Sequence, residues 1–409
     1  MDRLTLTNCR LPDGGLADVL LQGGLIAEVS YPGALQVLAP AYDVAGRLLT
    51  PGFTEPHLHP DKAFGLSEDR VPATNVGEAI ARLRQRKPLE TAEAVYLRTL
   101  RLLRLCLGFG TTRVRLHAEV DPLLGLRSVE GVLAARDEMA GQIHAEVVAF
   151  PQEGIVKEPG TLELMRQALS MGCDVVGAIT YQDADAGQHL EMAAGLAREF
   201  AAPLDVHADF CVPVETSQIE AVAAATLAYG LEGRVTLGHC TTLARMSPAE
   251  REVAVQMLVD RGSCLVVLPR TDLYLDGALA PLATLRDAGL RCFVASNNVC
   301  NAFTPAGRPS LPSVAALYSL ANHEASVPQM EALARSLWQS SAVSGAEARI
   351  EVGAVADLVV WPVEESWQIV SQEADPDLAL VGGEIVHSRL PGSIEEVTPA
   401  VVTSGRSKE

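Results

Sequence analysis

The feature that most constrains the fold is a series of eight short apolar segments between residues 51 and 294, most of them separated by a helical pattern. Glu215 to Tyr229 and Pro248 to Arg261 are two of these helical stretches. Eight strands alternating with helices is the count of a (β/α)8 barrel. We therefore predict an α/β fold, a TIM barrel over residues 51–348. Its strands are expected to end near Phe53, Leu116, Phe150, Ile179, Val206, Leu237, Leu268 and Val294.

Both ends of the chain show a different sequence pattern. Residues 1–50 contain short β-type runs separated by Gly pairs, as in a small antiparallel sheet. Similar runs return at Gly353 to Trp361 and at Ala379 to Val386. We predict that residues 1–50 and 349–392 form one composite β-sandwich, and that the small, polar residues 393–409 form a flexible tail.

Histidines stand at the ends of three predicted strands. His57 and His59 are two residues apart, so in a strand they project to the same side and can reach one ion. An isolated His-x-His is as readily two incidental histidines in a strand. His207 and His239, each at the end of a later strand, favour the metal site, because barrel active sites lie at the C-terminal strand ends.

Composition limits the partners. The formal net charge of −19 argues against nucleic acid, which proteins hold mainly through Lys and Arg. No stretch reaches the roughly 20 apolar residues that span a bilayer, and no signal-like segment opens the chain, so a cytoplasmic protein without a membrane partner is expected. Eight cysteines without a C-x-x-C pair suit reduced thiols. Whether the chain forms a homo-oligomer stays open.

With these residues in view, the chain resembles the amidohydrolase superfamily, and within it the cytosine deaminase and N-isopropylammelide amidohydrolase group. The resemblance runs over nearly the whole chain. The segment Pro151-Gln152-Glu153-Gly154 is its more specific motif, because a His-x-His after Pro-Gly-Phe is common to the superfamily. The other matching segments are Pro51 to His59, Asp174 to Ile179, Asp205 to His207, and Gly238-His239 with the Thr pair that follows.

The resemblance implies a (β/α)8 barrel with a small β-sandwich, and metal-assisted attack of water on a carbon that bears nitrogen. It implies that His57, His59 and His207 ligate one divalent ion, zinc being expected and iron the alternative. His239 would hold or polarise the nucleophile or the substrate. Gln152 would hydrogen-bond a small heterocyclic substrate.

Two positions depart from the family pattern. The deaminases carry Glu three residues after the histidine of strand five, where this chain has Phe210. They carry a metal-binding Asp at the end of strand eight, where this chain has Asn297. Neither residue can accept a proton from water, although the amide oxygen of Asn297 can bind a metal. General acid-base assistance is typically worth 10²–10⁴-fold, so ordinary hydrolytic deamination is in doubt.

Other residues could take over the proton work. Lys62 follows the histidine pair at a spacing that the N-isopropylammelide hydrolases share, and either contacts substrate or is an ordinary solvated lysine. Asp209 should point away from the side that Phe210 faces. His117, Glu119 and Asp121 end strand two, and we expect ordinary polar rim residues there rather than site residues.

Two functions follow. The first is a divergent metal-dependent hydrolase that acts on a C–N bond of a small cyclic polar substrate. Its catalytic residues would be His239, Asn297 and Lys62, and its substrate-binding residues Gln152, Phe210 and Lys62. The alternative is a degenerate barrel that binds a ligand or catalyses a step without a water nucleophile, such as isomerisation or cyclisation. Four histidines at one barrel mouth favour the first.

Overall fold

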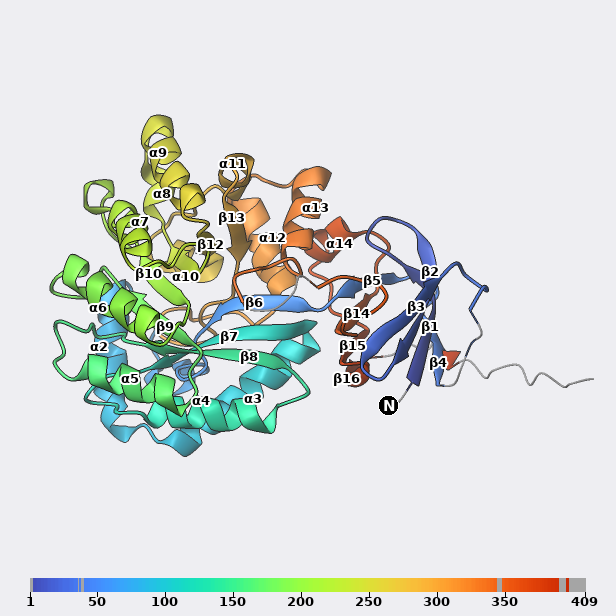
Figure 1. Cartoon of the computed structure of the whole chain (residues 1–409), viewed down its shortest axis with the longest axis horizontal. Helices are drawn as coiled ribbons and strands as arrows, with labels where there is room; N and C mark the ends of the chain where they lie inside the picture. Colours follow the sequence, from blue (N-terminus) through green and yellow to red (C-terminus); the bar gives the residue numbers. More distant parts are fainter. Residues whose placement is uncertain (1–2, 36, 38–39, 344–347, 390–394, 397–409) are drawn as a thin grey trace, which may run out of the picture.

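A barrel of eight parallel strands forms the larger part of the molecule (Figure 1). The computed structural model describes residues 3–35, 37, 40–343, 348–389 and 395–396. Neighbouring strands of the barrel follow one another in sequence, so the predicted barrel is confirmed. The strands are β6 (Phe53–Leu58), β7 (Thr111–Glu119), β8 (His144–Phe150), β9 (Val175–Ile179), β10 (Leu204–Ala208), β11 (Val235–His239), β12 (Cys264–Val267) and β13 (Arg291–Val294).

The barrel closes between β6 and the residues that follow β13. The backbone N–H of Asn297 donates to the carbonyl of His57 at 2.9 Å, and the N–H of His59 donates to the carbonyl of Asn297 at 2.8 Å. One level lower, the carboxylate of Glu55 accepts from the N–H of Ser296 at 3.0 and 3.1 Å. The seam is therefore tied at the same height as the histidine pair.

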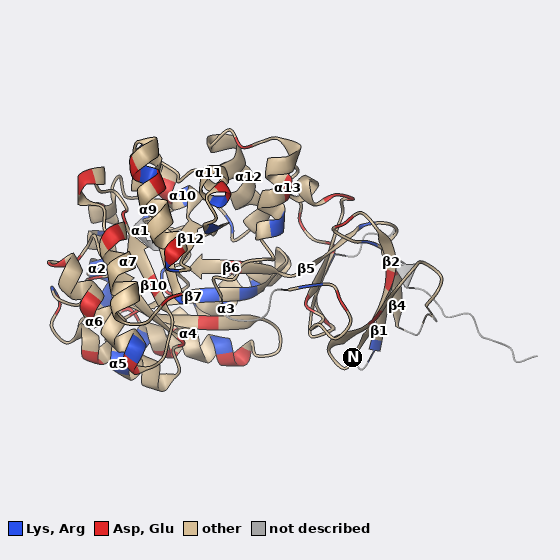
Figure 2. Ribbon diagram, turned by 45° about the horizontal axis from the view of Figure 1, so that its top comes forward, with Lys and Arg blue, Asp and Glu red and all other residues tan. Residues whose placement is uncertain are grey.

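Helices surround the barrel, and the main hydrophobic core lies between them and the strands. Several begin at side-chain caps, as at Thr91, whose hydroxyl accepts from the N–H of Ala94. Acidic and basic residues are interspersed over these outer helices (Figure 2). The α-helices and 3-10 helices are α1 (Leu66–Asp69), α2 (Val76–Arg86), η1 (Lys87–Leu89), α3 (Ala92–Gly108), α4 (Arg127–Glu138), α5 (Thr161–Met171), α6 (Ala186–Glu199), η2 (Val214–Thr216), α7 (Ile219–Ala228), α8 (Thr242–Arg245), α9 (Pro248–Asp260), α10 (Pro269–Leu275), α11 (Leu282–Asp287), α12 (Leu311–Ala321), α13 (Val327–Ser336) and α14 (Ser366–Ser371). None of the described helices is long and apolar enough to cross a bilayer.

A second sheet combines both ends of the chain and has its own apolar core. It lies beside the barrel in Figure 1. Strand β5 pairs with β14 and thereby joins the two ends, while β17 pairs with β4 at one side. The strands are β1 (Arg3–Arg10), β2 (Leu16–Gln22), β3 (Leu25–Ser30), β4 (Ala41–Asp43), β5 (Leu48–Pro51), β14 (Leu358–Trp361), β15 (Leu378–Val381), β16 (Glu384–Ser388) and β17 (Glu395–Glu396).

The second sheet packs against the strand beginnings of the barrel. The rings of Phe53 and Trp361 stack with centroids 4.7 Å apart. Arg113 and His144, near the starts of β7 and β8, each contact the carboxylate of Asp357, at 3.2 and 3.0 Å. The strand ends that carry the histidines therefore face away from the second sheet.

The sequence-based strand limits need two corrections. Strands β6, β7, β10 and β11 continue two to five residues beyond their expected ends. Ala379 to Val386 is not one strand but a hairpin of β15 and β16, because Gly382 and Gly383 adopt positive φ angles of 53° and 73° and turn the chain. Of the predicted tail, residues 393–394 and 397–409 lie outside the described residues.

Candidate metal and substrate site

Three of the predicted histidines converge inside the mouth of the barrel. His57 is in β6, His59 follows that strand directly, and His207 is in β10. Nε2 of His207 lies 3.0 Å from Nε2 of His57 and 3.1 Å from Nε2 of His59. Two nitrogens bonded to one zinc ion at about 2.0–2.1 Å each lie no more than about 4.2 Å apart. The spacing of these nitrogens therefore fits one ion.

The same three side chains are buried and favour the neutral form. Burial is the main reason that the pKa values of His57, His59 and His207 lie well below 6.5. Neighbouring histidines lower all three further, and Lys62 acts on His59 and His207. Neutral imidazole is the form that binds a metal.

A further histidine, His117 of β7, belongs to the same cluster. Its ring centroid lies 3.9 Å from that of His57, and its side chain is fully buried. Within the described residues, two groups of three side chains have metal-capable atoms within 4.8 Å of one another, and His117 is in both. These groups are His57, His59 and His117, and His117, Asp205 and His207.

Asp205 supports this cluster from below. Its carboxylate lies 3.1 Å from Nε2 of His117 and accepts from Arg115 at 3.0 Å. Burial alone would raise the pKa of Asp205. The nearby His117, His57 and Arg115 lower this pKa by a larger amount, so the net shift is downward. The result is one buried negative charge directly behind the neutral histidines.

His239 lies opposite, at the end of β11, and is oriented by Asp272. Its Nδ1 is 2.6 Å from Oδ1 of Asp272, whose other oxygen accepts from the N–H of Leu268 at 2.9 Å. Because a carboxylate can only accept, Nδ1 carries the proton and Nε2 of His239 is left to other partners. Phe210 stacks on the His239 ring with centroids 4.0 Å apart.

Asn297 presents one amide group to the site. Its Nδ2 donates to Oγ1 of Thr271 at 3.0 Å, and Thr271 shares a further hydrogen bond of 2.6 Å with Thr304. Oδ1 of Asn297 is buried and has no partner among the described residues. A buried oxygen without a partner is unfavourable, and a cation beside the histidines would satisfy it.

Lys62 is not solvated, because its side chain is 6% exposed and lies in a buried ion-pair network. Its Nζ pairs with Glu119 and donates to Oε1 of Gln152 at 3.3 Å. Lys87 pairs with Glu119 at 3.1 Å, and also with Asp121 and Glu153. Two lysines therefore share the Glu119 carboxylate behind the site.

Two further sequence predictions can be compared with this geometry. The expectation that His117, Glu119 and Asp121 are ordinary rim residues is wrong, because all three are buried at 2% exposure or less. Asp209 points away from Phe210 as expected. Its carboxylate accepts from the N–H of Gln218 at 2.7 Å and from the hydroxyl of Thr242 at 2.6 Å.

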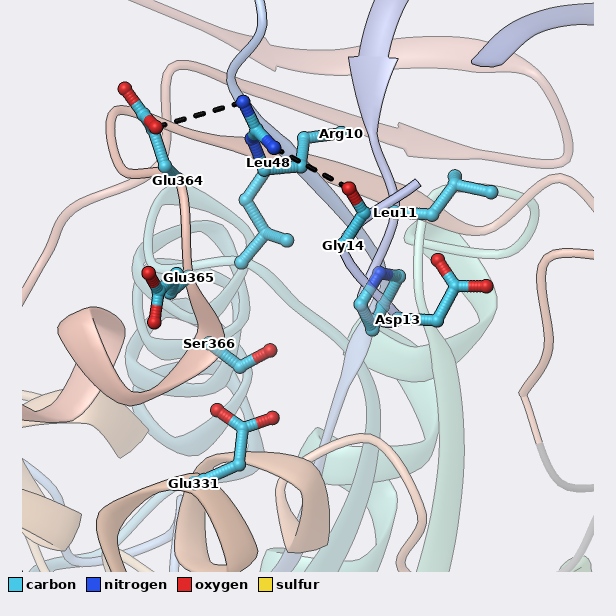
Figure 3. A pocket seen from close by; sticks show the side chains of 10 residues that line it. Arg10, Leu11, Asp13, Gly14, Leu48, Glu331, Glu364, Glu365 and Ser366 are labelled. Carbon is cyan, nitrogen blue, oxygen red and sulfur yellow. Dashed lines mark hydrogen bonds and ion pairs between the residues drawn. The ribbon is translucent and has the colours of Figure 1, made fainter. Parts of the chain in front are cut away.

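A small cavity joins these groups, and all but one of its lining side chains are buried. It is lined by His59, Lys62, Gln152, Tyr181, His207, Phe210, His239, Thr271, Asn297, Asn298 and Phe303. A different cavity lies where the second sheet meets the barrel (Figure 3). There Arg10 donates to the carbonyl of Gly14 at 3.4 Å and pairs with Glu364 at 3.6 Å, and no histidine is present.

Comparisons with known proteins agree with the architecture. A family model described as "Amidohydrolase family" matches residues 41–387. N-isopropylammelide isopropyl amidohydrolase of Pseudomonas sp. (strain ADP) is 28% identical over 350 residues, 81% of this chain and 84% of that protein. Pterin deaminase of Rhizobium rhizogenes is 24% identical over 92% of this chain and 89% of its own length. The structure of 5-methylcytosine deaminase from Klebsiella pneumoniae is similar with a TM-score of 0.86 and 25% identity, covering 94% and 97% of the two chains.

Proposed function

The chain belongs to the amidohydrolase family, and from that premise we propose a metal-dependent hydrolase that cleaves a C–N bond of a small, cyclic, polar substrate. The observation that carries the proposal is the convergence of three buried, neutral imidazoles on one point. The names of the relatives given above, an amidohydrolase and two deaminases, describe enzymes that act on C–N bonds of small molecules, which supports the same reaction class.

His57, His59 and His207 would hold one divalent ion, with zinc the first choice and iron the alternative. Imidazole suits both metals, so the ligands alone do not select one. When bound, such an ion supplies Lewis acidity and lowers the pKa of water to about 7. The buried, unpartnered Oδ1 of Asn297 is an uncharged oxygen that could complete the ligand set, and His117 adjoins the same histidines.

The remaining polar groups would bind and orient the substrate. His239 keeps its proton on Nδ1, so its Nε2 can accept a proton or a hydrogen bond. Lys62 holds the oxygen of Gln152, which turns the amide nitrogen of Gln152 to the cavity. We propose that His239, Lys62 and Gln152 act on the substrate directly.

The second candidate is a barrel that binds a ligand or catalyses isomerisation or cyclisation. Two observations favour it. Phe210 occupies the position where a proton-carrying Glu is expected and stacks on His239. No described Asp or Glu lines the cavity. A reaction that excludes water would suit such a wall.

One experiment separates the two. Protein purified without added metal is analysed for bound metals, and is then tested against a set of cyclic amides and aminated heterocycles. A hydrolase should hold about one metal ion per chain and release product from at least one compound. Bound metal without any hydrolysis would favour the second candidate. Protein that contains no bound metal would contradict both the proposed metal site and the proposed hydrolase function.

The expected cytoplasmic location, and the absence of a nucleic-acid partner, remain predictions from composition.

A further inference from the structure

The cavity between the second sheet and the barrel has a volume of about 280 Å³ (Figure 3). The turn after β1, strand β5, helix α13 and the start of α14 all contribute to its lining. This volume is close to that of the smallest ligand sites, about 300 Å³. The histidine cluster lies at the other end of the barrel, so this cavity is separate from the proposed metal and substrate site.

Ser366 gives this cavity a polar group without a partner. Its side chain is 2% exposed, and its Oγ has no hydrogen-bond partner among the described residues. Ser366 lines the cavity, and its hydroxyl points into the hollow in Figure 3. A buried polar atom without a partner is unfavourable, and a ligand in the cavity would provide the partner.

Backbone donors around the start of α14 are already occupied. The N–H groups of Glu364 and Glu365 donate to Oε1 of Gln368 at 3.0 and 2.9 Å. The N–H of Trp367 donates to the carboxylate of Glu331 at 3.0 Å. Three donors that an anion could have used therefore have protein partners.

Carboxylates outnumber basic groups around the cavity. Arg10 is the basic residue of the lining, and the acidic ones are Asp13, Glu331, Glu364 and Glu365. Arg335 pairs with Glu331 at 2.7 Å, so four carboxylates face two bases. Nε of Arg10 has no partner among the described residues and could donate to an anion, but its guanidinium already pairs with Glu364 at 3.6 Å. The excess of negative charge favours a cation over an anion.

An organic cation fits this cavity better than a metal ion. Within the described residues, both groups of three side chains that are close enough to share an ion lie in the histidine cluster. The carboxylates around this cavity are not among them. Leu11, Pro12 and Leu48 form an apolar part of the lining, against which an alkyl chain can pack.

We propose that this cavity binds a small alkylammonium ion, which donates to Oγ of Ser366 and packs its alkyl group against Leu48. An ammonium group has three donors and no acceptor, so it complements both the hydroxyl oxygen and the surrounding carboxylates. Its binding would bridge the second sheet and the barrel. This site is independent of the proposed hydrolysis.

Isoamylamine, isoamyl alcohol and isocaproate test the proposal, because they share one alkyl group and differ in charge. Binding of each to the full-length protein is measured by calorimetry at about 0.15 M salt, which screens the general attraction of an acidic surface for cations. We expect isoamylamine to bind at about one site per chain. Its affinity should exceed that of the alcohol at least about tenfold, roughly the effect of one hydrogen bond to a charged group.

Ser366→Ala identifies the site. It should lower the affinity for isoamylamine about tenfold. Because the hydroxyl that it removes has no partner, the ligand-free variant should be at least as stable as the unaltered protein, which urea unfolding measures. Ser371→Ala, at an exposed position of the same helix, is the matched control and should leave binding unchanged.

A charge variant tests the preference for a cation. Glu364→Gln should weaken the binding of isoamylamine about threefold, because it removes one exposed carboxylate from the lining. Glu252→Gln removes the same charge from an exposed position outside this cavity and should have no effect.

Thermal unfolding gives a second readout. A ligand that binds only the folded state stabilises it, so isoamylamine should raise the unfolding temperature of the unaltered protein and of the Ser371→Ala variant. The increase should be much smaller for the Ser366→Ala variant. Chelation of metal should leave these differences unchanged, since the histidine cluster is not involved.

Four results would each overturn the proposal. They are no binding of isoamylamine, equal binding of the amine and the alcohol, tighter binding of isocaproate than of isoamylamine, and an affinity for isoamylamine that Ser366→Ala leaves unchanged.

Discussion

At the cavity, Phe210 and Asn297 stand where the resemblance leads one to expect a Glu and an Asp. Phe210 stacks on one face of His239, and Asn297 lines the same cavity with a buried amide oxygen that has no partner among the described residues. We predict that the paired substitution Phe210→Glu with Asn297→Asp raises trace hydrolysis of aminated heterocycles. Each change alone should do less, because both groups would serve the same proton path. Product release measured on cytosine and related compounds checks this.

The unaltered protein is the reference for that experiment. It should show little or no cytosine turnover. A rate ordinary for enzymes, about 1–10³ s⁻¹, would mean that another residue carries the proton. Alanine variants at Asp209 and Glu119 would then be tested first. Neither carboxylate lines the cavity, but the structure favours Glu119, because it pairs with the cavity residue Lys62, whereas Asp209 accepts from Gln218 and Thr242.

Asp272 determines which nitrogen of His239 carries the proton. Asp272→Asn places an amide at this position: its oxygen can still accept from the N–H of Leu268, and its NH2 group then faces Nδ1 of His239, which favours the tautomer with the proton on Nε2. We expect hydrolysis to fall by about 10²–10⁴-fold, because Nε2 of His239 would no longer be held as an acceptor. Nitrogen NMR of His239 should show the proton moving from Nδ1. A variant with the original tautomer and reduced activity would contradict this role.

The sequence alone identified the residues whose spacing along strands carries information. His57, His59, His207 and His239 were found because strand periodicity places them at one end of the barrel. His117 was underrated, since one histidine on a strand has no partner at short sequence distance. Asp272 was missed, because its contact with His239 spans 33 residues and follows no local pattern.

At the scale of elements, the short helix α10 orients two cavity groups at once. Thr271 accepts from Asn297, and its neighbour Asp272 holds His239. A shift of this helix would therefore change both groups together. Such a coupling is not visible in sequence, because the three strands involved meet only in the closed barrel.

Close approach between β8 and β9 gives a prediction about packing. A Cβ added to Gly177 would lie 2.7 Å from the carbonyl oxygen of Ala149 and 2.9 Å from Cα of Phe150, both backbone atoms of β8. We expect Gly177→Ala to destabilise the protein by about 1–3 kcal/mol. It should also weaken metal binding, since the Phe150 ring lies 4.2 Å from the His207 ring. Urea unfolding and metal analysis measure the two effects.

Gly195 in α6 provides the matched control. Its added Cβ would meet only an ordinary contact, 3.7 Å from Tyr229. Because Gly in a helix interior is less favourable than Ala, Gly195→Ala should stabilise by about 0.5–1 kcal/mol. Equal stability of the two variants would contradict the close approach of the β8 backbone to Gly177.

For the whole molecule, we expect the free energy of unfolding of the metal-free protein to fall as the pH drops below about 6.5. The pKa values of His57, His59 and His207 lie well below 6.5 in the folded state, mainly because of burial. The unfolded chain therefore takes up protons that the folded chain does not. Each histidine can contribute about 1.4 kcal/mol per pH unit.

Two buried carboxyl groups act in the opposite direction. Burial raises the pKa of Glu55 from 4.5 to about 7 and that of Asp61 from 3.8 to about 6. The folded state binds these protons first, so they offset part of the histidine effect. Urea unfolding with a chelator at about pH 7 and pH 5.5 measures the sum. Between these two pH values an unfolded histidine is only partly protonated, so His59→Gln should reduce the slope by about 0.8 kcal/mol per pH unit, and an unchanged slope would contradict the shift.

The barrel and the sheet from both chain ends could be predicted, because alternating apolar segments and helical patterns repeat along the whole chain. Strand ends were placed too early where polar residues such as His117 and Glu119 continue β7 into the barrel interior. Polarity suggested a loop there. The buried network of Asp205, Lys62 and Lys87 satisfies these residues, and it forms only after the strands have assembled.

The backbone of Asn297 restricts how the site can vary over evolutionary time. Its φ angle of 59° is left-handed, a conformation in which Gly, Asn and Asp are the readily tolerated residues. Since its backbone also closes the barrel, the conformation cannot relax without opening the seam. Mutation at this position is thereby confined to a very short list of amino acids. Asn and Asp are both on it and are separated by a single nucleotide change, so a lineage can exchange a charged for an uncharged ligand here without rebuilding its fold.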